Sequence, residues 1–270
     1  MRIKIEDINI RIRIRIYCYI LIIFIIISNK MKSLYIKYIK LLDSKNEGIP
    51  KVVIYSCVIG NYDNISSFKK QKGFDYFFFT DQKIENTNWT ILPIPKYVEK
   101  FNLSKVKKQR YIKIHPHKFF KKYDLSIYID ANYVIKGDLN DFLINILNPI
   151  DNIYITHLQF GRTPEKAIKA AINKKLDKFE VLNNTFRRYD DKILKMDGIV
   201  NAGLIIRKHN NKDCVKLMNK WWKEIKKYSH VDNFSFNYAA YKTGVRFLYI
   251  SYQFTLDYFK QKEHLKKINY

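Results

Sequence analysis

Cysteine is scarce in this sequence: its 270 residues include Cys18, Cys57 and Cys214 and no other cysteine. They are far apart, form no C-x-x-C pair and have no histidine at ligand spacing, so the sequence predicts neither a disulfide framework nor a zinc site. A G-x-S-x-G segment is missing too, which argues against a serine hydrolase of that type. No motif repeats with a period of about 20 to 50 residues, which excludes a solenoid.

Acidic residues are also few, with 25 Asp and Glu against 50 Lys and Arg, a net charge of +25. Such a charge ordinarily indicates a nucleic acid, an anionic membrane or a phosphorylated ligand. Here most basic residues are lysines spread along the whole chain beside abundant Ile, Asn and Tyr, as an AT-rich genome would produce. Because no nucleic-acid-binding motif is present, we do not expect a nucleic-acid partner, although a binding assay over a salt series must decide.

The N-terminal part differs from the rest in composition. Arginines at positions 11, 13 and 15 precede an apolar run, 16–27, that is shorter than the roughly 20 residues of a standard membrane span. Residues 11–30 predict either a short membrane anchor or, if the chain starts at Met31, no anchor and a cytoplasmic protein. We therefore expect an N-terminal segment with its linker over residues 1–50 and one domain over residues 51–270.

From Lys51 onward, strand-like and helix-like segments alternate. Strands are predicted at 52–59, 76–81, 89–94, 125–130, 153–158 and 198–208, and helices at 104–115, 138–147, 164–179, 211–229 and 234–242. The segment after Pro116 is predicted as a further short helix. This alternation predicts an α/β fold with a mixed, mostly parallel sheet and helices on both faces.

Polar residues follow several of these strands, at 60–63, 80–81, 130–132 and 157. Because ligands of such sheets bind at the carboxyl ends of the strands, we expect these positions to converge on one site. Asp130 and Asn132 are two residues apart, so strand geometry would point both side chains the same way, toward one shared divalent cation. Alternatively, Asp130 caps the next turn and Asn132 takes a left-handed backbone conformation.

A series of segments carries a resemblance to a known family: VVIYSCVIGNYD, YFFFTD, KKQRYIKIHPHKFF, YDLSIYIDAN, THLQFGR, GIVNAGLIIRKHN and WWKEIKKYSHVDNFSFNYAAYK. In this order they resemble the glycosyltransferase-like domain family of plant Golgi proteins and bacterial polysaccharide loci. More broadly, they resemble the GT-A nucleotide-sugar glycosyltransferases. The resemblance covers about residues 51–245 and implies a GT-A-like (Rossmann-like) fold, a nucleotide-sugar donor and a glycan or glycoconjugate acceptor.

The resemblance also implies roles for residues of the donor site. Gly60, Tyr62 and Asp63 would line the nucleotide, with Gly60 letting the backbone approach it and Asp63 accepting from ribose or base. Arg110 and Lys113, one helical turn apart, match an R-x-x-K pattern that would meet the diphosphate. The plainer alternatives are a simple turn at 60–63 and a solvated basic helix around Arg110.

Asp130 matches the first acid of the family's DxD-like element, but Asn132 replaces the second. An amide offers an oxygen without a charge, so Mn²⁺ or Mg²⁺ binding would be weakened and metal-independence becomes a serious alternative. Asn201 to Gly203 resemble the N-A-G turn with which these enzymes approach acceptor and sugar, and Gly203 inside a strand indicates close backbone approach.

Asp232 stands in a segment similar to the family's R-D-Q-x-S-F, with Val231 in place of Arg and Asn233 in place of Gln. It is the best carboxylate for a catalytic role, either deprotonating an acceptor hydroxyl or supporting positive charge on the sugar. Alternatively it only caps the following helix. These departures keep a second function open, that of a non-catalytic glycan- or nucleotide-binding domain of the same fold.

Overall fold

The structure, a computed structural model, describes residues 50–60, 63, 65, 68–147, 151–159 and 162–263, with only the backbone given at 157–159. The predicted anchor at 11–30 and the linker lie outside these residues, so the boundary near residue 50 stays a prediction. Within the described part of the chain, none of the helices is long and apolar enough to cross a membrane.

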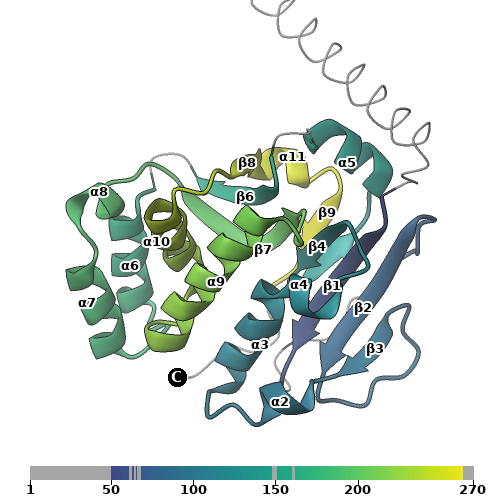
Figure 1. Cartoon of the computed structure of the whole chain (residues 1–270), viewed down its shortest axis with the longest axis horizontal. Coiled ribbons are helices and arrows are strands. Elements are labelled where there is room, and N and C mark those ends of the chain that lie inside the picture. The colour runs from purple at the N-terminus through teal and green to yellow at the C-terminus, as the bar shows by residue number, and fades with distance from the viewer. Residues whose placement is uncertain are drawn as a thin grey trace, which may run out of the picture. The chain divides into compact units, whose positions relative to one another are not determined.

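A seven-stranded sheet in the order β3-β2-β1-β4-β7-β6-β8 forms the centre of the domain (Figure 1). Its strands are β1 (Val52–Val58), β2 (Phe74–Thr80), β3 (Thr90–Pro93), β4 (Leu125–Ile129), β6 (Ile153–Gln159), β7 (Ile199–Arg207) and β8 (Leu248–Ser251). A separate pair joins β5 (Tyr133–Ile135) and β9 (Phe259–Gln261). The helices are α2 (Lys96–Glu99), α3 (Lys105–Ile114), α4 (Pro116–Phe119), α5 (Leu139–Ile146), α6 (Pro164–Asn173), α7 (Phe179–Arg188), α8 (Asp191–Leu194), α9 (Lys212–Lys227), α10 (Asp232–Thr243) and α11 (Tyr252–Thr255).

Every strand of the large sheet except β7 runs in the same direction. The pairs β1–β2, β2–β3, β1–β4 and β6–β8 are parallel, whereas β7 is antiparallel to both β4 and β6. The predicted mixed, mostly parallel α/β sheet is therefore confirmed. Because β4 is the central one of the seven strands, the residue that follows it lies at the middle of the sheet edge formed by the strand ends.

Several helices begin where the sequence supplies capping side chains. Ser104, Thr163 and Asn211 accept backbone N–H bonds at the starts of α3, α6 and α9. Asp138 caps α5 as predicted, with its Oδ1 accepting from the amides of Asn140 and Asp141. The predicted break at Pro116 separates α3 from α4.

One predicted helix is too long. The segment 164–179 ends at Asn173, because Lys175 has a positive φ of 51° and the chain turns before α7 begins. The sequence pattern also gave no sign of α2, α7, α8, β5, β8, α11 or β9, which are short or weakly patterned. His157, expected just after a strand, lies within β6.

The core lies between the sheet and three helices on one of its faces. Val53, Tyr55 and Cys57 of β1 form one buried cluster with residues of α3, α9 and α10. Figure 1 shows where these three helices lie. On the opposite face, Ile54 and Ile127 are fully buried as well. Burial on both faces explains why the strands read as continuous apolar runs instead of alternating with polar residues.

Trp221 and Trp222 offer a test of this core, since adjacent positions on α9 give them different surroundings. Trp221 is 0% exposed and donates from Nε1 to the Asp232 carbonyl (3.2 Å) and to Ser235 Oγ (3.0 Å). We expect Trp221→Ala to cost about 3 to 5 kcal/mol of unfolding free energy. Trp222 is half-buried against Tyr111, so Trp222→Ala should cost roughly 1 to 2 kcal/mol in the same urea titration. Equal losses would contradict this description of the core.

Candidate functional site

Asp130 follows directly after β4 and keeps the direction of that strand for one more residue. Its amide donates to the Gly203 carbonyl of β7 (2.8 Å), which continues the β4–β7 pairing. Its Oδ1 accepts from the Tyr128 hydroxyl (2.7 Å) and lies 3.4 Å from Lys113 Nζ. Burial, and then the Asp130 charge, raises the pKa of Tyr128 well above its usual value, so this hydroxyl stays a donor. Asp130 is thus held in place by the Tyr128 hydroxyl, the Lys113 ammonium and the backbone of β7.

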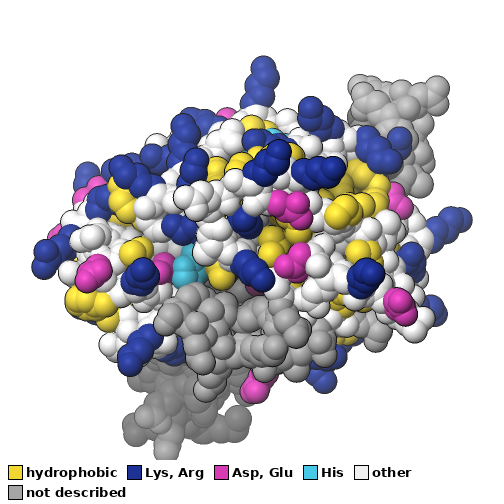
Figure 2. Space-filling model, turned by 90° about the horizontal axis from the view of Figure 1, so that it is seen from below, with side chains coloured by type: hydrophobic (Ala, Val, Ile, Leu, Met, Phe, Trp, Pro, Cys, Tyr) yellow, Lys and Arg dark blue, Asp and Glu magenta, His cyan; other side chains and the backbone are white. Residues whose placement is uncertain are grey.

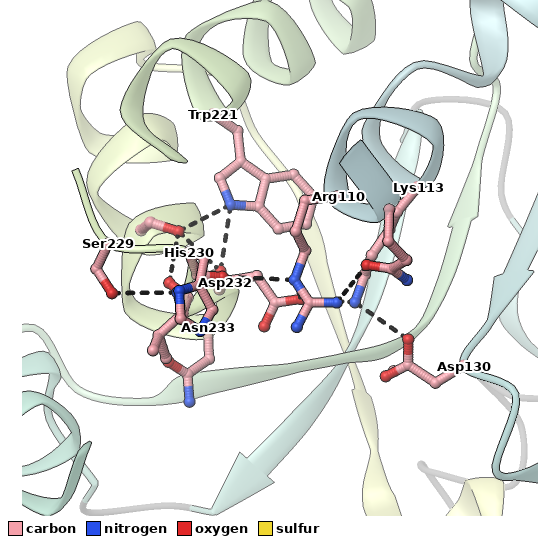
Figure 3. Close-up of polar contacts among 12 residues, drawn as sticks. Arg110, Lys113, Asp130, Trp221, Ser229, His230, Asp232 and Asn233 are labelled. Carbon is pink, nitrogen blue, oxygen red and sulfur yellow. Dashed lines mark hydrogen bonds and ion pairs between the residues drawn. The ribbon is translucent and has the colours of Figure 1, made fainter. Parts of the chain in front are cut away.

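Asp232 is the first residue of α10 and approaches Asp130 from the other side of Lys113 (Figure 3). Its Oδ2 lies 2.6 Å from Lys113 Nζ and 3.1 Å from Arg110 Nε. Burial favours the neutral acid, but Arg110 and Lys113 outweigh it and lower the pKa of Asp232 to about 2. The N-cap position of α10 is Val231, and no side chain caps the helix. Asp232 therefore does not have the capping role that was the alternative.

Lys113 connects the two carboxylates. Its side chain is 1% exposed, against 26% for Asp130 and 15% for Asp232. The ammonium also lies 4.9 Å from the centre of the Tyr128 ring. The Lys113 carbonyl accepts a 2.5 Å bond from the Tyr55 hydroxyl, which ties α3 to β1. Its ammonium is buried and paired with both acids, and the diphosphate contact that the resemblance implies for Lys113 stays a prediction.

Arg110 is the more accessible cation of the predicted pair, with 21% of its side chain exposed. Besides Asp232, it contacts the His230 carbonyl through Nε (3.4 Å) and donates from Nη1 to Gln109 Oε1 (2.6 Å). Gln109 in turn donates to the Tyr128 hydroxyl (2.7 Å). A chain of polar contacts therefore runs from Arg110 through Gln109 and Tyr128 to Asp130.

Gly203 lets β7 come close to this group. A Cβ at Gly203 would stand 2.9 Å from the Tyr133 ring and 3.1 Å from Asp130 Oδ2, distances that a larger residue does not tolerate. Asn201 accepts the Gly203 amide at 2.9 Å and donates to the Tyr133 hydroxyl at 3.1 Å. Protein side chains therefore come close to the Gly203 backbone, while its approach to acceptor and sugar stays a prediction. Asn201 to Gly203 lie within β7 and form no turn.

Asn132 does not extend the alternation of the strand. Since β4 ends at Ile129, Asn132 stands in a turn, and the two-residue rule no longer fixes where its side chain points. Its Nδ2 donates to the Lys262 carbonyl, and its own carbonyl accepts the Lys262 amide, both at 2.8 Å. It does not have a left-handed backbone, because the positive-φ residues other than glycine in the described chain are Asn86 and Lys175.

The turn after β1 is attached to the neighbouring strand and to α3. Gly60 has a φ of +80°, its amide donates to Asp81 Oδ1 at 2.8 Å, and its carbonyl accepts from Gln82 at 2.6 Å. The exposed Lys105 of α3 lies against it, with Nζ 3.4 Å from where a Cβ would be. Asp63 is buried, and Tyr62 lies outside the described residues.

A divalent cation does not fit these residues as they stand. Among the residues that the structure describes, no three His, Cys, Asp or Glu side chains are grouped where they would hold a metal ion. The Lys113 ammonium occupies the space between Asp130 and Asp232. At an effective dielectric of about 20, it would oppose a divalent cation 4 Å away by roughly 8 kcal/mol, cancelling the attraction of one carboxylate at that distance.

Sequence reasoning missed several members of this site. Tyr128 is two residues before Asp130 on the same strand face, and Gln109 is four residues before Lys113 on the same helix face, so periodicity alone would have suggested both. The contact of Asn201 with Tyr133 and the position of Lys105 over Gly60 have no comparable signal.

No protein-family model and no curated protein matches the sequence. Among solved structures, the chain is similar to the apo form of the bifunctional glycosyltransferase WbbM, at 13% identity and a TM-score of 0.48. That alignment covers 75% of this chain but 39% of WbbM, so the chain spans well under half of that protein's length.

Two further similar structures also bear transferase names. Apo mouse xyloside xylosyltransferase 1 aligns at 9% identity and a TM-score of 0.45, covering 74% of this chain and 84% of that one. The galactosyltransferase LgtC, with donor and acceptor sugar analogs, aligns at 11% identity and a TM-score of 0.41, covering 73% and 72%. Identities and TM-scores this low transfer no role to any residue, so the function must follow from the contacts of the site itself.

The lowered pKa of Asp232 makes a prediction about acid stability. Because the pKa falls from 3.8 unfolded to about 2 folded, the ionised group contributes roughly 2 kcal/mol above pH 4, and this contribution is lost as pH falls toward 2. The stability advantage of the wild type over Asp232→Asn should therefore shrink between pH 5 and pH 2.5 in chemical denaturation. The control Asp191→Asn removes an exposed ion pair and should show no such trend. A constant difference for Asp232→Asn would contradict the assignment.

Proposed function

We propose that this chain is a glycosyltransferase, which moves a sugar from a nucleotide-sugar donor to a glycan, lipid or protein acceptor. One observation carries the proposal: Asp130 and Asp232, distant in sequence, meet on either side of Lys113, with Arg110 beside them. This group stands at the carboxyl end of β4, where sheets of this kind bind ligands. The sequence resemblance to GT-A transferases points to the same reaction.

The proposed reaction exchanges one bond to the sugar's anomeric carbon for another. The bond to the diphosphate oxygen breaks and its electron pair leaves with the nucleotide, while an acceptor oxygen bonds to the same carbon and loses its proton. The transition state needs negative charge near the sugar, positive charge near the diphosphate and a proton acceptor. The residues of the site offer the first two directly, and the more exposed carboxylate, Asp130, would take the proton of the acceptor hydroxyl.

The two carboxylates suit different tasks. With a pKa of about 2 and two cations bound, Asp232 is ionised at neutral pH but is a weak base, which favours an electrostatic role toward the sugar. Asp130 is the more exposed carboxylate, so we assign to it the contact with the donor sugar or the acceptor hydroxyl. Asn201 and Gly203 border Asp130 and would form the wall against which the sugar lies.

Positive charge for the leaving diphosphate comes from α3. Arg110 is partly exposed, and a guanidinium can bind a phosphate through two N–H groups. Lys105 lies over the turn at Gly60 and is exposed, so a nucleotide bound at this turn would place its phosphates between Lys105 and Arg110. The close contact of Gly60 with Lys105 supports a place for the donor at this end of β1.

Two other functions compete with this proposal. A non-catalytic binding domain is favoured by the full internal pairing of Asp232, which leaves it little basicity. A nucleic-acid-binding protein is favoured by the net charge of +25, but the basic side chains on the face in Figure 2 are scattered and form no single patch. Steep loss of nucleic-acid binding with salt would support that last reading.

Arg110→Ala should weaken donor binding. Loss of a charge-assisted contact to the diphosphate is worth about 1.5 to 3 kcal/mol, which is about 10- to 150-fold in Kd, with little effect on folding. Titration calorimetry with UDP-, GDP- and CMP-sugars first finds the donor, and the variant is then compared with Arg187→Ala, an exposed arginine on α7. Unchanged affinity in Arg110→Ala would rule out the diphosphate contact.

Asp130→Asn should abolish sugar transfer and leave the melting temperature nearly unchanged. The amide oxygen can still accept from Tyr128, and Asp232 still pairs with Lys113, so the fold keeps its contacts while the negative charge is lost. Transfer is measured by the amount of free nucleotide released, and Asp191→Asn is the matched control. If the wild type binds a nucleotide sugar but releases no nucleotide with any acceptor, the binding-domain alternative holds instead.

A further inference from the structure

The centre of the site already holds a cation supplied by the chain. Lys113 Nζ lies 2.6 Å from Asp232 Oδ2 and 3.4 Å from Asp130 Oδ1, between acids that come from different elements. Figure 3 shows the ammonium directed toward both carboxylates. Two converging carboxylates with a cation between them are the arrangement in which a divalent ion would otherwise be expected.

The Lys113 side chain is held in this place by more than its charge. It is 1% exposed, its ammonium faces the Tyr128 ring at 4.9 Å, and its own carbonyl is bonded to Tyr55 at 2.5 Å. An ammonium without its acids would be a buried, unpaired charge, which proteins avoid. A metal ion that displaced Lys113 would therefore have to separate this buried ammonium from both acids.

The charges around Lys113 balance without a metal. Lys113 and Arg110 offset Asp130 and Asp232, whereas an added divalent ion would leave an excess of positive charge in a partly buried site. Asn132, where an acid would strengthen metal binding, contributes no charge, and its amide nitrogen is bonded to the Lys262 carbonyl. The residues thus suit a monovalent cation between two acids.

We propose that Lys113 is the resident counter-cation of this site, in the place of a divalent metal, and that transfer by this chain requires no metal ion. The inference rests on the proposed glycosyltransferase function. Lys113 acts as a positioning residue: it fixes Asp130 and Asp232 relative to each other, and the partly exposed Arg110 and the exposed Lys105 are left to face the diphosphate.

The decisive measurement is Mn²⁺ binding by the full-length protein. The free ion is measured by electron paramagnetic resonance. Any Mn²⁺ binding by the wild type should be unchanged in Asp130→Asn. Lys113→Met removes the ammonium and leaves two facing carboxylates, so it should gain a saturable Mn²⁺ site, at least tenfold tighter than any binding to the wild type. The double variant Lys113→Met/Asp130→Asn should lose that site. A role of Lys113 in folding alone would not produce this gain.

Controls separate the possible failures. Lys108→Met removes another lysine of α3, one that contacts the Glu99 carbonyl, and should bind Mn²⁺ no better than the wild type. If circular dichroism shows that Lys113→Met is unfolded, Lys113→Gln is used instead. The wild-type titration is informative even without a Lys113 variant. Wild-type Mn²⁺ binding that depends on Asp130, or a folded Lys113 variant that gains no site, overturns the proposal.

Activity gives an independent arm. Wild-type transfer should proceed at the same rate in EDTA as in 1 mM Mn²⁺ or Mg²⁺, whereas transfer that needs the metal overturns the inference but keeps the proposed function. Absence of transfer with and without metal counts against the proposed function, and the Mn²⁺ titrations then still decide whether Lys113 occupies the cation position.

Discussion

The buried ammonium of Lys113 is the interaction on which the arrangement of the site depends. A charge with 1% exposure must be paired, and its partners Asp130 and Asp232 come from the end of β4 and the start of α10. The three groups fix the relative positions of α3, the sheet and α10 at one point. If both acids were lost, the Lys113 ammonium would be an unpaired cation inside the protein.

The backbone around this point is built to hold it. Tyr55 attaches α3 to β1 through the Lys113 carbonyl, and Trp221 attaches α9 to the first residue of α10 through the Asp232 carbonyl. The absence of a side chain at Gly203 lets the antiparallel β7 lie against Asp130 and Tyr133. Core packing and site geometry therefore depend on the same residues, since side chains of the hydrophobic core also make the hydrogen bonds that position the charged groups.

Compensation of charge also shapes what the site can do. Asp232 is held ionised by two cations, so it can act through its negative charge but is a weak base. Arg110 is shared between Asp232 and the more exposed surface, where an anionic ligand would compete for it. A diphosphate that draws Arg110 away would leave Asp232 with Lys113 alone and raise its basicity, a direct coupling between donor binding and the carboxylate.

The sequence by itself determined the α/β class, every strand of the large sheet except β8, the break at Pro116 and the identity of the acids and cations at the strand ends. These features follow from local patterns: apolar runs, capping residues, proline and helical spacing. The spacing of Arg110 and Lys113 correctly placed them on one helix face, and both reach Asp232.

Only the tertiary structure decided how these residues are used. The strand rule for Asp130 and Asn132 stopped applying once β4 ended at Ile129, and Asn132 was bonded to Lys262, 130 positions further along the chain. Whether Lys113 faces solvent or two carboxylates depends on where α10 begins in space, and no local pattern contains that information. Long-range pairing of a buried charge is a property of the folded chain, because the cost of burial exists only after the chain has folded.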